Sequence, residues 1–270
     1  MKTLVIATRN AHKVGEIRAI LGAGFHCLTL NDLPSSPEVI EDAGTFAGNA
    51  TKKAVVLATW LRDTWTRTEP EETEITEART LFPPLAPVST ALFSLSPSDG
   101  ERVGVRGIGG VFHELAQKDQ LYVLADDSGL EVDALNGAPG VHSARFAALD
   151  TGQPGNSPTA ENNAKLLRLL GDMPLDRRTA RFRCVLALTP VPRPTGGMKA
   201  EEGRMQTELF EGTCEGRIDV APRGRCGFGY DPLFVPAGYN RTFGELDEAI
   251  KNKLSHRARA LALLRAKLSD

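Results

Sequence analysis

Two adjacent carboxylates, Asp126 and Asp127, stand directly after a short apolar run in the sequence. The run Leu121–Ala125 predicts a buried strand, and ligands bind at the carboxyl ends of strands in open α/β sheets. Neighbouring carboxylates repel each other unless a cation compensates their charge. Because adjacent strand residues point to opposite faces, we expect one of the two to face that cation. The alternative is an Asx turn that leads into the next element.

The turn Thr8–Lys13 combines several groups that bind phosphate. It lies between an apolar, β-branched run and a segment with helical spacing, and its residues are Thr8, Arg9, Asn10, Ala11, His12 and Lys13. Backbone N–H groups at a helix N-terminus attract anions, and Asn10 and Lys13 add side-chain donors. The alternative is an ordinary turn with a solvated lysine, because turns of this kind are common.

Two further segments carry polar or aromatic groups suited to a nucleotide. The acidic pair Glu41-Asp42 precedes a predicted helix start at Thr45, where carboxylates can bind Mg²⁺ together with phosphate oxygens or simply favour the helix N-terminus. The run Gly227-Phe228-Gly229-Tyr230-Asp231-Pro232 lets the backbone approach a flat ligand on which the aromatic rings can stack. Its alternative is a glycine-rich turn with core aromatics.

The basic stretch Lys251–Arg257 offers donors to phosphate and to a carbonyl oxygen. It contains Lys251, Ser255, His256 and Arg257, of which the first two share a face if the stretch is helical. The alternative is a solvated basic helix start.

The elements that position these residues are a mixture of strands and helices, beginning with a strand, a tight turn and a helix. The apolar patterns predict strands over Lys2–Thr8, Leu121–Ala125, Ala180–Leu188 and Glu208–Ile218, and helices over His12–Leu21, Phe46–Leu61, Glu161–Leu170 and Asp247–Lys267. This order predicts an α/β fold in one domain that spans residues 1–270. About residues 62–119 lack this pattern and are rich in Thr, Glu, Pro, Ser and Gly, so we expect a largely disordered insertion, with one short helix near Val111–Gln117. A smaller polar loop is expected over Pro190–Gln206.

Composition narrows the function classes. The chain has 270 residues and a net charge of -2, which argues against attachment to nucleic acid by bulk positive charge. No apolar run reaches the roughly 18 to 20 residues that a membrane span requires, and the N-terminus lacks a signal-peptide pattern. We therefore expect a soluble, cytoplasmic protein that uses neither nucleic acid nor membrane as a partner. Cys27, Cys184, Cys214 and Cys226 have neither metal-site nor redox-motif spacing, so reduced thiols are expected.

The order of these motifs resembles the inosine triphosphate pyrophosphatase family, the RdgB-type non-standard purine nucleoside triphosphate pyrophosphatases. The matching segments are ATRNAHKVGEI, TFAGNATKKA, LADDSGLEVDALNGAPGVHSARFA, RFRCVLAL, FEGTCEGRI, GFGYDPLFVP and KNKLSHRARAL. They span nearly the whole chain outside the expected insertion and the polar loop. The resemblance implies an elongated, two-lobed α/β fold with a mixed central sheet, a cleft between the lobes and a homodimer.

The resemblance also implies roles for individual residues. Asp127 matches the general base and a metal ligand, Glu41 matches the second metal ligand, and Mg²⁺ is the implied cofactor. The implied substrate contacts are Thr8, Arg9, Asn10, Ala11, His12, Lys13, Ser128, Phe228, Gly229, Tyr230, Asp231, Lys251, His256 and Arg257. Gly48, Ala249 and Ile250 replace glutamates that are common in the family, and the spacing around Glu41 is one residue tighter than in many members.

The activity implied is hydrolysis of ITP, dITP and XTP to the nucleoside monophosphate and pyrophosphate, which cleanses the nucleotide pool. Arg257 is expected to donate to the 6-oxo group of the purine, a position where adenine presents a donor instead. Two alternatives are a pyrophosphatase for other modified nucleotides, such as methylated pyrimidines, and a catalytically silent nucleotide-binding protein.

Overall fold

A computed structural model of the chain describes residues 2–68, 115, 120–152, 154–192 and 206–269. Its strands are β1 (Lys2–Ile6), β2 (Phe25–Thr29), β3 (Leu121–Val132), β4 (Thr179–Pro190), β5 (Glu208–Ile218) and β6 (Phe234–Pro236). Its α-helices are α1 (Ala11–Leu21), α2 (Phe46–Thr68), α4 (Thr159–Leu170), α5 (Glu248–Leu254) and α6 (His256–Ser269). A 3-10 helix, η3, spans Gly140–Arg145. Strands and α-helices alternate from β1 to α2, where β2 stands between the two helices that the sequence predicts.

The strands form one mixed, open sheet with the order β2-β1-β3-β4-β5-β6. The first three strands of this order are parallel, and the pairs from β3 to β6 are antiparallel. Pairing between β1 and β3 ends at Ile6 and Leu124, whereas pairing between β3 and β4 continues to Val132 and Ala180. The larger part of β3, from Ala125 to Val132, therefore extends past the end of β1, and the edge left open there borders the site described below.

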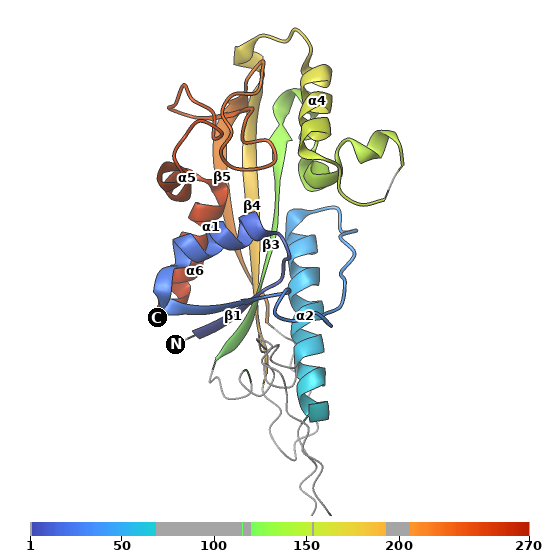
Figure 1. The fold of residues 1–270 in the computed structure, drawn as a ribbon, viewed down its shortest axis with the longest axis vertical. Helices are drawn as coiled ribbons and strands as arrows, with labels where there is room; N and C mark the ends of the chain where they lie inside the picture. The colour runs from blue at the N-terminus through green and yellow to red at the C-terminus, as the bar shows by residue number, and fades with distance from the viewer. Residues whose placement is uncertain (1, 69–114, 116–119, 153, 193–205, 270) are drawn as a thin grey trace, which may run out of the picture.

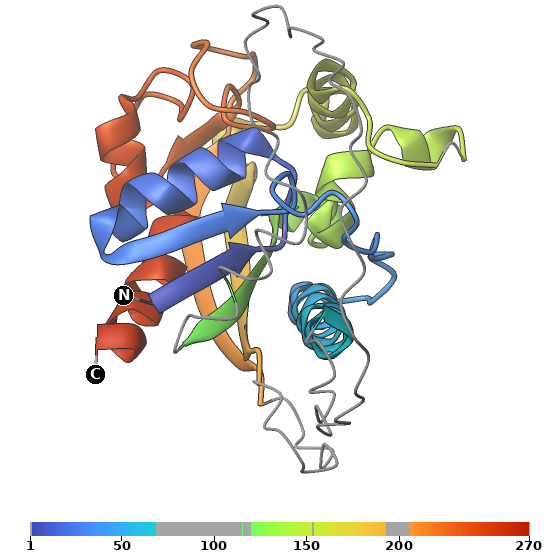
Figure 2. The same ribbon diagram turned by 60° about the horizontal axis from the view of Figure 1, so that its bottom comes forward.

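Helices cover both faces of the sheet in an elongated molecule. Figures 1 and 2 show α1, α5 and α6 on one face, and α2 and α4 on the other. Alternation along β1 supplies both layers, because Val5 packs in the cluster under α2 while Leu4 and Ile6 pack in the cluster under α1 and α6. A third cluster around Phe182 and Phe234 fills the far, antiparallel end of the sheet. The α/β class and the mixed central sheet expected from the sequence are confirmed.

Several predicted boundaries were wrong. Strand β3 does not end at Ala125 but runs on through the aspartate pair, because β4 pairs with it along this whole stretch. Helix α2 continues past Leu61 to Thr68. The single helix expected near the C-terminus is two helices, α5 and α6, that break at Ser255. Strands β2 and β6 were not predicted.

Most of the expected insertion lies outside the described residues. Its first part belongs to α2, and Leu115, which falls in the expected short helix, is helical and 1% exposed in the cluster under α2. The polar loop Pro190–Gln206 lies mainly outside the described residues as well. Among the helices that the structure describes, none is long and apolar enough to span a membrane. The four cysteines are free thiols, as expected.

Candidate active site

A cleft of about 970 Å³ opens where β1 ends beside β3. Its walls include residues of the turn after β1, of helix α2 and of the loop around Phe228. Its lining includes Thr8, Arg9, Asn10, Lys13, Glu41, Asp127, Ser128, Phe228, Gly229, Tyr230, Asp231, Lys251, His256 and Arg257. Of the expected site residues, only Ala11 and His12 are outside this lining, and the His12 ring stacks on Phe228 with centroids 5.3 Å apart. The structure thus brings together residues that are as much as 249 positions apart in the sequence, from Thr8 to Arg257.

Asn10 caps the first helix. Its Oδ1 accepts hydrogen bonds from the backbone N–H groups of His12 and Lys13, at 3.0 and 3.2 Å. Two of the N–H groups expected to bind phosphate are therefore already engaged by the cap. The Lys13 ammonium, which reaches the carboxylate of Asp126, remains at the cleft wall as a positive charge.

Asp127 faces α2, where amide and ammonium groups surround it. Asn49 Nδ2 donates to its Oδ2 at 3.1 Å, and Lys53 Nζ lies 3.4 Å from its Oδ1. Lys53 Nζ also lies 3.3 Å from Glu41 Oε1, so this ammonium stands between the two expected metal ligands. Burial raises the pKa of Asp127, and the nearby Glu41 charge adds to the increase, while Lys53 opposes it. A carboxylate with a raised pKa is a suitable proton acceptor.

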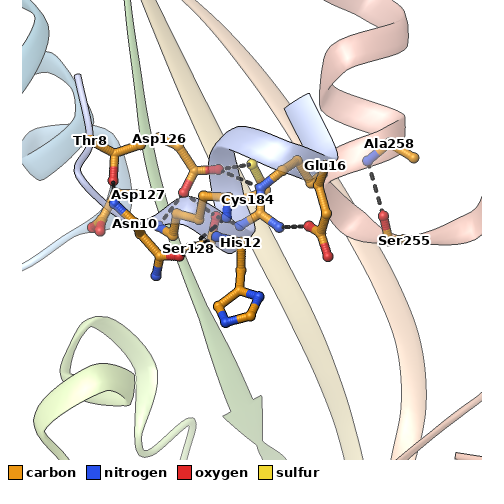
Figure 3. Close-up of polar contacts among 12 residues, drawn as sticks. Thr8, Asn10, His12, Glu16, Asp126, Asp127, Ser128, Cys184, Ser255 and Ala258 are labelled. Carbon is orange, nitrogen blue, oxygen red and sulfur yellow. Dashed lines mark hydrogen bonds and ion pairs between the residues drawn. The ribbon is translucent and has the colours of Figure 1, made fainter. Parts of the chain in front are cut away.

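Asp126 faces the opposite side of the sheet, toward α1 and α6. Its carboxylate accepts a hydrogen bond from Arg257 Nε at 2.9 Å and pairs with Lys13. Burial by itself would raise the pKa of Asp126, but the charges of Arg257 and Lys13 outweigh that effect and hold the pKa well below its ordinary value. Figure 3 shows Asp126 and Cys184 turned toward one another, with Asp127 directed away from them.

Glu16 on α1 joins two of the expected substrate contacts. Its carboxylate pairs with Arg257 and, at 2.6 Å, with Lys251 Nζ, which lies 2.7 Å from Asp231 Oδ2. All these side chains are buried, and together with Lys13 and Asp126 they alternate in charge. Burial lowers the pKa of Lys251, but the carboxylates of Asp231 and Glu16 outweigh it, so the pKa lies above its ordinary value. Lys251 therefore stays charged at neutral pH.

The loop from Gly227 to Asp231 is held by its own side chains. Asp231 Oδ2 accepts a hydrogen bond from Phe228 N at 2.7 Å, and a Cβ on Gly227 would lie 2.1 Å from the same oxygen. Tyr230 is 4% exposed and its hydroxyl donates to the Ser143 carbonyl at 2.9 Å. The expectation that both aromatic rings can stack on a base is therefore corrected: Tyr230 braces the loop, whereas Phe228 stays partly exposed at the cleft.

The break between α5 and α6 places His256 and Arg257 under the cleft. The Ser255 hydroxyl accepts a hydrogen bond from Ala258 N at 3.2 Å and so caps α6 (Figure 3). Gly212 on β5 lets the helix approach, because a Cβ there would lie 2.1 Å from the His256 carbonyl oxygen. The His256 ring stacks on Phe182 at 4.8 Å, and its Nδ1 has no hydrogen-bond partner among the described residues.

Sequence reasoning missed Glu16, Lys53, Asn49 and Cys184 as members of the site. Glu16 and Lys53 have the spacing of ordinary helix residues, and burial alone distinguishes them in the structure. Lys53 and Asn49 do fall inside the segment TFAGNATKKA, which is one of the segments that resemble the family.

The donor set on the α2 side suits one Mg²⁺ ion. Glu41 and Asp127 approach the same ammonium group, so their carboxylates lie near enough to serve one cation. Within the described part of the chain, no group of three or more His, Cys, Asp or Glu side chains is placed to hold a metal. Mg²⁺ is usually held by one or two carboxylates together with substrate phosphates and water, so two carboxylates fit it.

Comparison with known proteins gives a consistent match. A model of the Ham1 family matches residues 4–68 and 111–267 and leaves out the centre of the expected insertion. A dITP/XTP pyrophosphatase of Desulforamulus reducens is 40% identical over 259 residues, which are 96% of this chain and 91% of the relative. A dITP/XTP pyrophosphatase of Geobacter sulfurreducens is 38% identical over 266 residues, covering 98% of this chain and 96% of the relative.

Solved structures give the same match. The Ham1 protein of Staphylococcus aureus superposes with a TM-score of 0.64 at 28% identity, covering 99% of this chain and 98% of the other. A nucleoside-triphosphatase, or dITP/XTP pyrophosphatase, of Mycobacterium abscessus superposes with a TM-score of 0.56 at 31% identity, covering 97% and 98%.

Proposed function

The chain belongs to the Ham1 family, and we propose that it hydrolyses non-standard purine nucleoside triphosphates, such as ITP, dITP and XTP, to the monophosphate and pyrophosphate. The observation that carries the proposal is one cleft that is lined both by the cations Lys13, Lys251 and Arg257 and by the carboxylates of Glu41 and Asp127. The positive groups suit a triphosphate, and the carboxylates of Glu41 and Asp127 suit a cation and a proton transfer. In the cell this activity would remove damaged purines from the cytoplasmic nucleotide pool.

Glu41 and Asp127 are the residues that would hold Mg²⁺. When bound, the ion neutralises charge on phosphate oxygens. Asp127 accepts a proton from the water that attacks the α-phosphorus in line with the leaving pyrophosphate. Asn49 fixes the orientation of the Asp127 carboxylate through its 3.1 Å hydrogen bond.

Lys13 and Lys251 bind phosphate oxygens on the opposite wall, and Phe228 and His256 contact the base. The expected hydrogen bond from Arg257 to the 6-oxo group competes with existing bonds, because its guanidinium already pairs with Asp126 and Glu16. His256 is the better placed group, since its Nδ1 is buried and lacks a partner within the described residues. Burial and the charge of Arg257 lower the pKa of His256 well below its ordinary value, so its ring is neutral at pH 7 and carries one donor and one acceptor.

A substrate panel separates this function from the alternatives. The substrates are ITP, dITP, XTP, ATP, GTP and a methylated pyrimidine triphosphate. Added inorganic pyrophosphatase converts the released pyrophosphate to orthophosphate, which is measured. We expect kcat/KM for ITP and XTP to exceed that for ATP by on the order of 10² or more, because a mismatched base leaves buried polar groups unpaired. Preference for the methylated pyrimidine would indicate a pyrophosphatase for other modified nucleotides. Binding of ITP without turnover would indicate a catalytically silent nucleotide-binding protein.

We also propose that the protein is a homodimer, as the family resemblance implies. Light scattering coupled to gel filtration tests this, because one chain has a mass of 29.1 kDa. A particle with the mass of a single chain would contradict the proposal.

A further inference from the structure

The carboxylate of Asp126 is fully occupied by donors. Its Oδ1 accepts hydrogen bonds from the Lys13 ammonium and, at 2.9 Å, from Ser128 Oγ. Its Oδ2 accepts from Arg257 Nε at 2.9 Å and from Cys184 Sγ at 3.3 Å. An ionised carboxylate has about four acceptor positions, so little capacity remains for a substrate or a metal ion.

Three of these four donors also line the cleft. Lys13, Ser128 and Arg257 belong to its wall. Asp126 is also a lining residue of the cleft, but its side chain has 0% exposure. Lysine and arginine side chains have many rotamers, and holding them in one place before a ligand arrives reduces the entropy lost on binding. The buried carboxylate of Asp126 therefore helps to set the positions of Lys13, Ser128 and Arg257, and Glu16 is a second partner of Arg257.

The backbone of Asp126 reaches the opposite wall. Its carbonyl oxygen accepts a hydrogen bond from Lys53 Nζ at 2.7 Å, and the same ammonium lies beside Asp127 and Glu41. Thus the side chain of Asp126 contacts the wall made by α1 and α6, and its main chain contacts the wall made by α2.

We propose that Asp126 is a positioning residue: its carboxylate holds the phosphate-binding Lys13, together with Arg257 and the Ser128 hydroxyl, at the cleft wall and does not touch the substrate itself. The inference rests on the proposed function for the identity of the substrate. It assigns Asp126 to binding and Asp127 to chemistry, although the two carboxylates are adjacent in the chain.

The test is Asp126→Asn, which keeps the shape of the side chain but removes its charge and turns an NH₂ group toward a donor. We expect the KM for ITP and the Kd for inorganic pyrophosphate, measured by calorimetry, to rise roughly tenfold or more, as for the loss of a hydrogen bond to a buried charge. The kcat should change less than about threefold, because the surroundings of Asp127 on the other face remain intact.

Asp219→Asn is the matched control. It removes a carboxylate that pairs with Arg223 at 2.6 Å and lies outside the cleft, so stability can fall while KM and the pyrophosphate Kd stay at wild-type values. If Asp126→Asn fails to fold, Asp126→Glu keeps the charge and moves the carboxylate by one methylene. It should also weaken pyrophosphate binding, because the donors follow the carboxylate.

Wild-type pyrophosphate affinity in a folded Asp126 variant would overturn the inference. A fall in kcat at constant KM would also overturn it, because Asp126 would then act in the chemical step. Pyrophosphate binding is measured without turnover. A wild-type protein that hydrolyses no triphosphate, yet needs Asp126 to bind pyrophosphate, would refute the proposed function and leave this inference standing.

Discussion

The carboxylates of Asp126 and Asp127 are adjacent in β3 and point to opposite faces of the sheet, as alternation along a strand requires. Burial acts to raise the pKa of both. For Asp126 the charges of Arg257 and Lys13 outweigh burial and lower the pKa, whereas for Asp127 the net pKa is raised. One carboxylate is thereby a fixed acceptor, and its neighbour is able to take a proton.

Replacing Asp127 tests its role as the proton acceptor. Asp127→Asn keeps the size of the side chain but removes the proton acceptor, so we expect kcat for ITP to fall by roughly 10²-fold or more, the range of general-base catalysis. Circular dichroism and the melting temperature establish that the variant is folded. Turnover near the wild-type rate in a folded variant would exclude Asp127 as the base.

A variant of Glu41 tests the proposed Mg²⁺ site. Glu41→Gln removes one of two carboxylates near Lys53, so the Mg²⁺ concentration that gives half-maximal activity should rise roughly tenfold or more. Asp42→Asn is the control, because Asp42 is exposed and pairs with Lys52 at 2.6 Å. An unchanged Mg²⁺ requirement in Glu41→Gln would remove Glu41 from the metal site.

The sequence was informative where the determinants are local. The turn after the first strand has a recognisable cap at Asn10, and the aspartate pair stands out after an apolar run. The end of β3 was misplaced because its apolar run stops where the cleft begins, while its pairing with β4 continues from Asp126 to Val132. That pairing joins residues 48 to 60 positions apart, which a local pattern does not reveal.

The burial of charged helix residues could not be predicted from the sequence pattern either. Glu16 in α1 and Lys53 in α2 have the spacing of solvent-facing side chains, but they are 7% and 8% exposed in the structure. Their partners come from α5, α6 and β3, so only the folded arrangement identifies them. The break at Ser255 has neither glycine nor proline to mark it, and the hydroxyl that caps α6 acts only once the chain turns there.

The buried His256 predicts a pH dependence of stability. Because burial lowers its pKa in the folded protein, the unfolded chain takes up a proton on this ring below about pH 6.5 while the folded protein does not. The unfolded state then binds more protons, so stability falls as pH falls from about 6.5 toward the folded pKa, by up to about 1.4 kcal/mol per pH unit. Urea unfolding between about pH 7 and pH 5.5 should show a smaller pH slope in His256→Gln.

A histidine outside the cleft provides the control for that experiment. His142 is exposed, so His142→Gln should keep the wild-type pH slope of unfolding free energy. Equal slopes for the wild type and His256→Gln would contradict the account of a neutral, buried ring.

Composition predicts that the middle of the expected insertion is dispensable. Segments rich in Pro, Ser, Gly and Thr bury little apolar surface, and the closure entropy of a loop grows only with the logarithm of its length. Replacing residues 69–110 with a short Gly/Ser linker should therefore leave melting temperature and ITP turnover nearly unchanged. Loss of turnover would show that the segment acts as a lid or a dimer contact.

Leu115 gives the contrasting variant for that deletion. It is 1% exposed in the cluster under α2, so Leu115→Ala should destabilise the protein by about 2–5 kcal/mol. A Leu115→Ala variant as stable as the wild type would mean that this side chain is not part of the core.

The central claim, attack of water at the α-phosphorus, is tested most directly by following the oxygen of the water. ITP is hydrolysed in water enriched in the heavy oxygen isotope, and mass spectrometry locates the label in the separated products. With Asp127 activating water for attack at the α-phosphorus, the label should appear in IMP, and pyrophosphate should remain unlabelled. Label in pyrophosphate would place the attack at the β-phosphorus, and IDP with labelled orthophosphate would place it at the γ-phosphorus; either result would contradict the account.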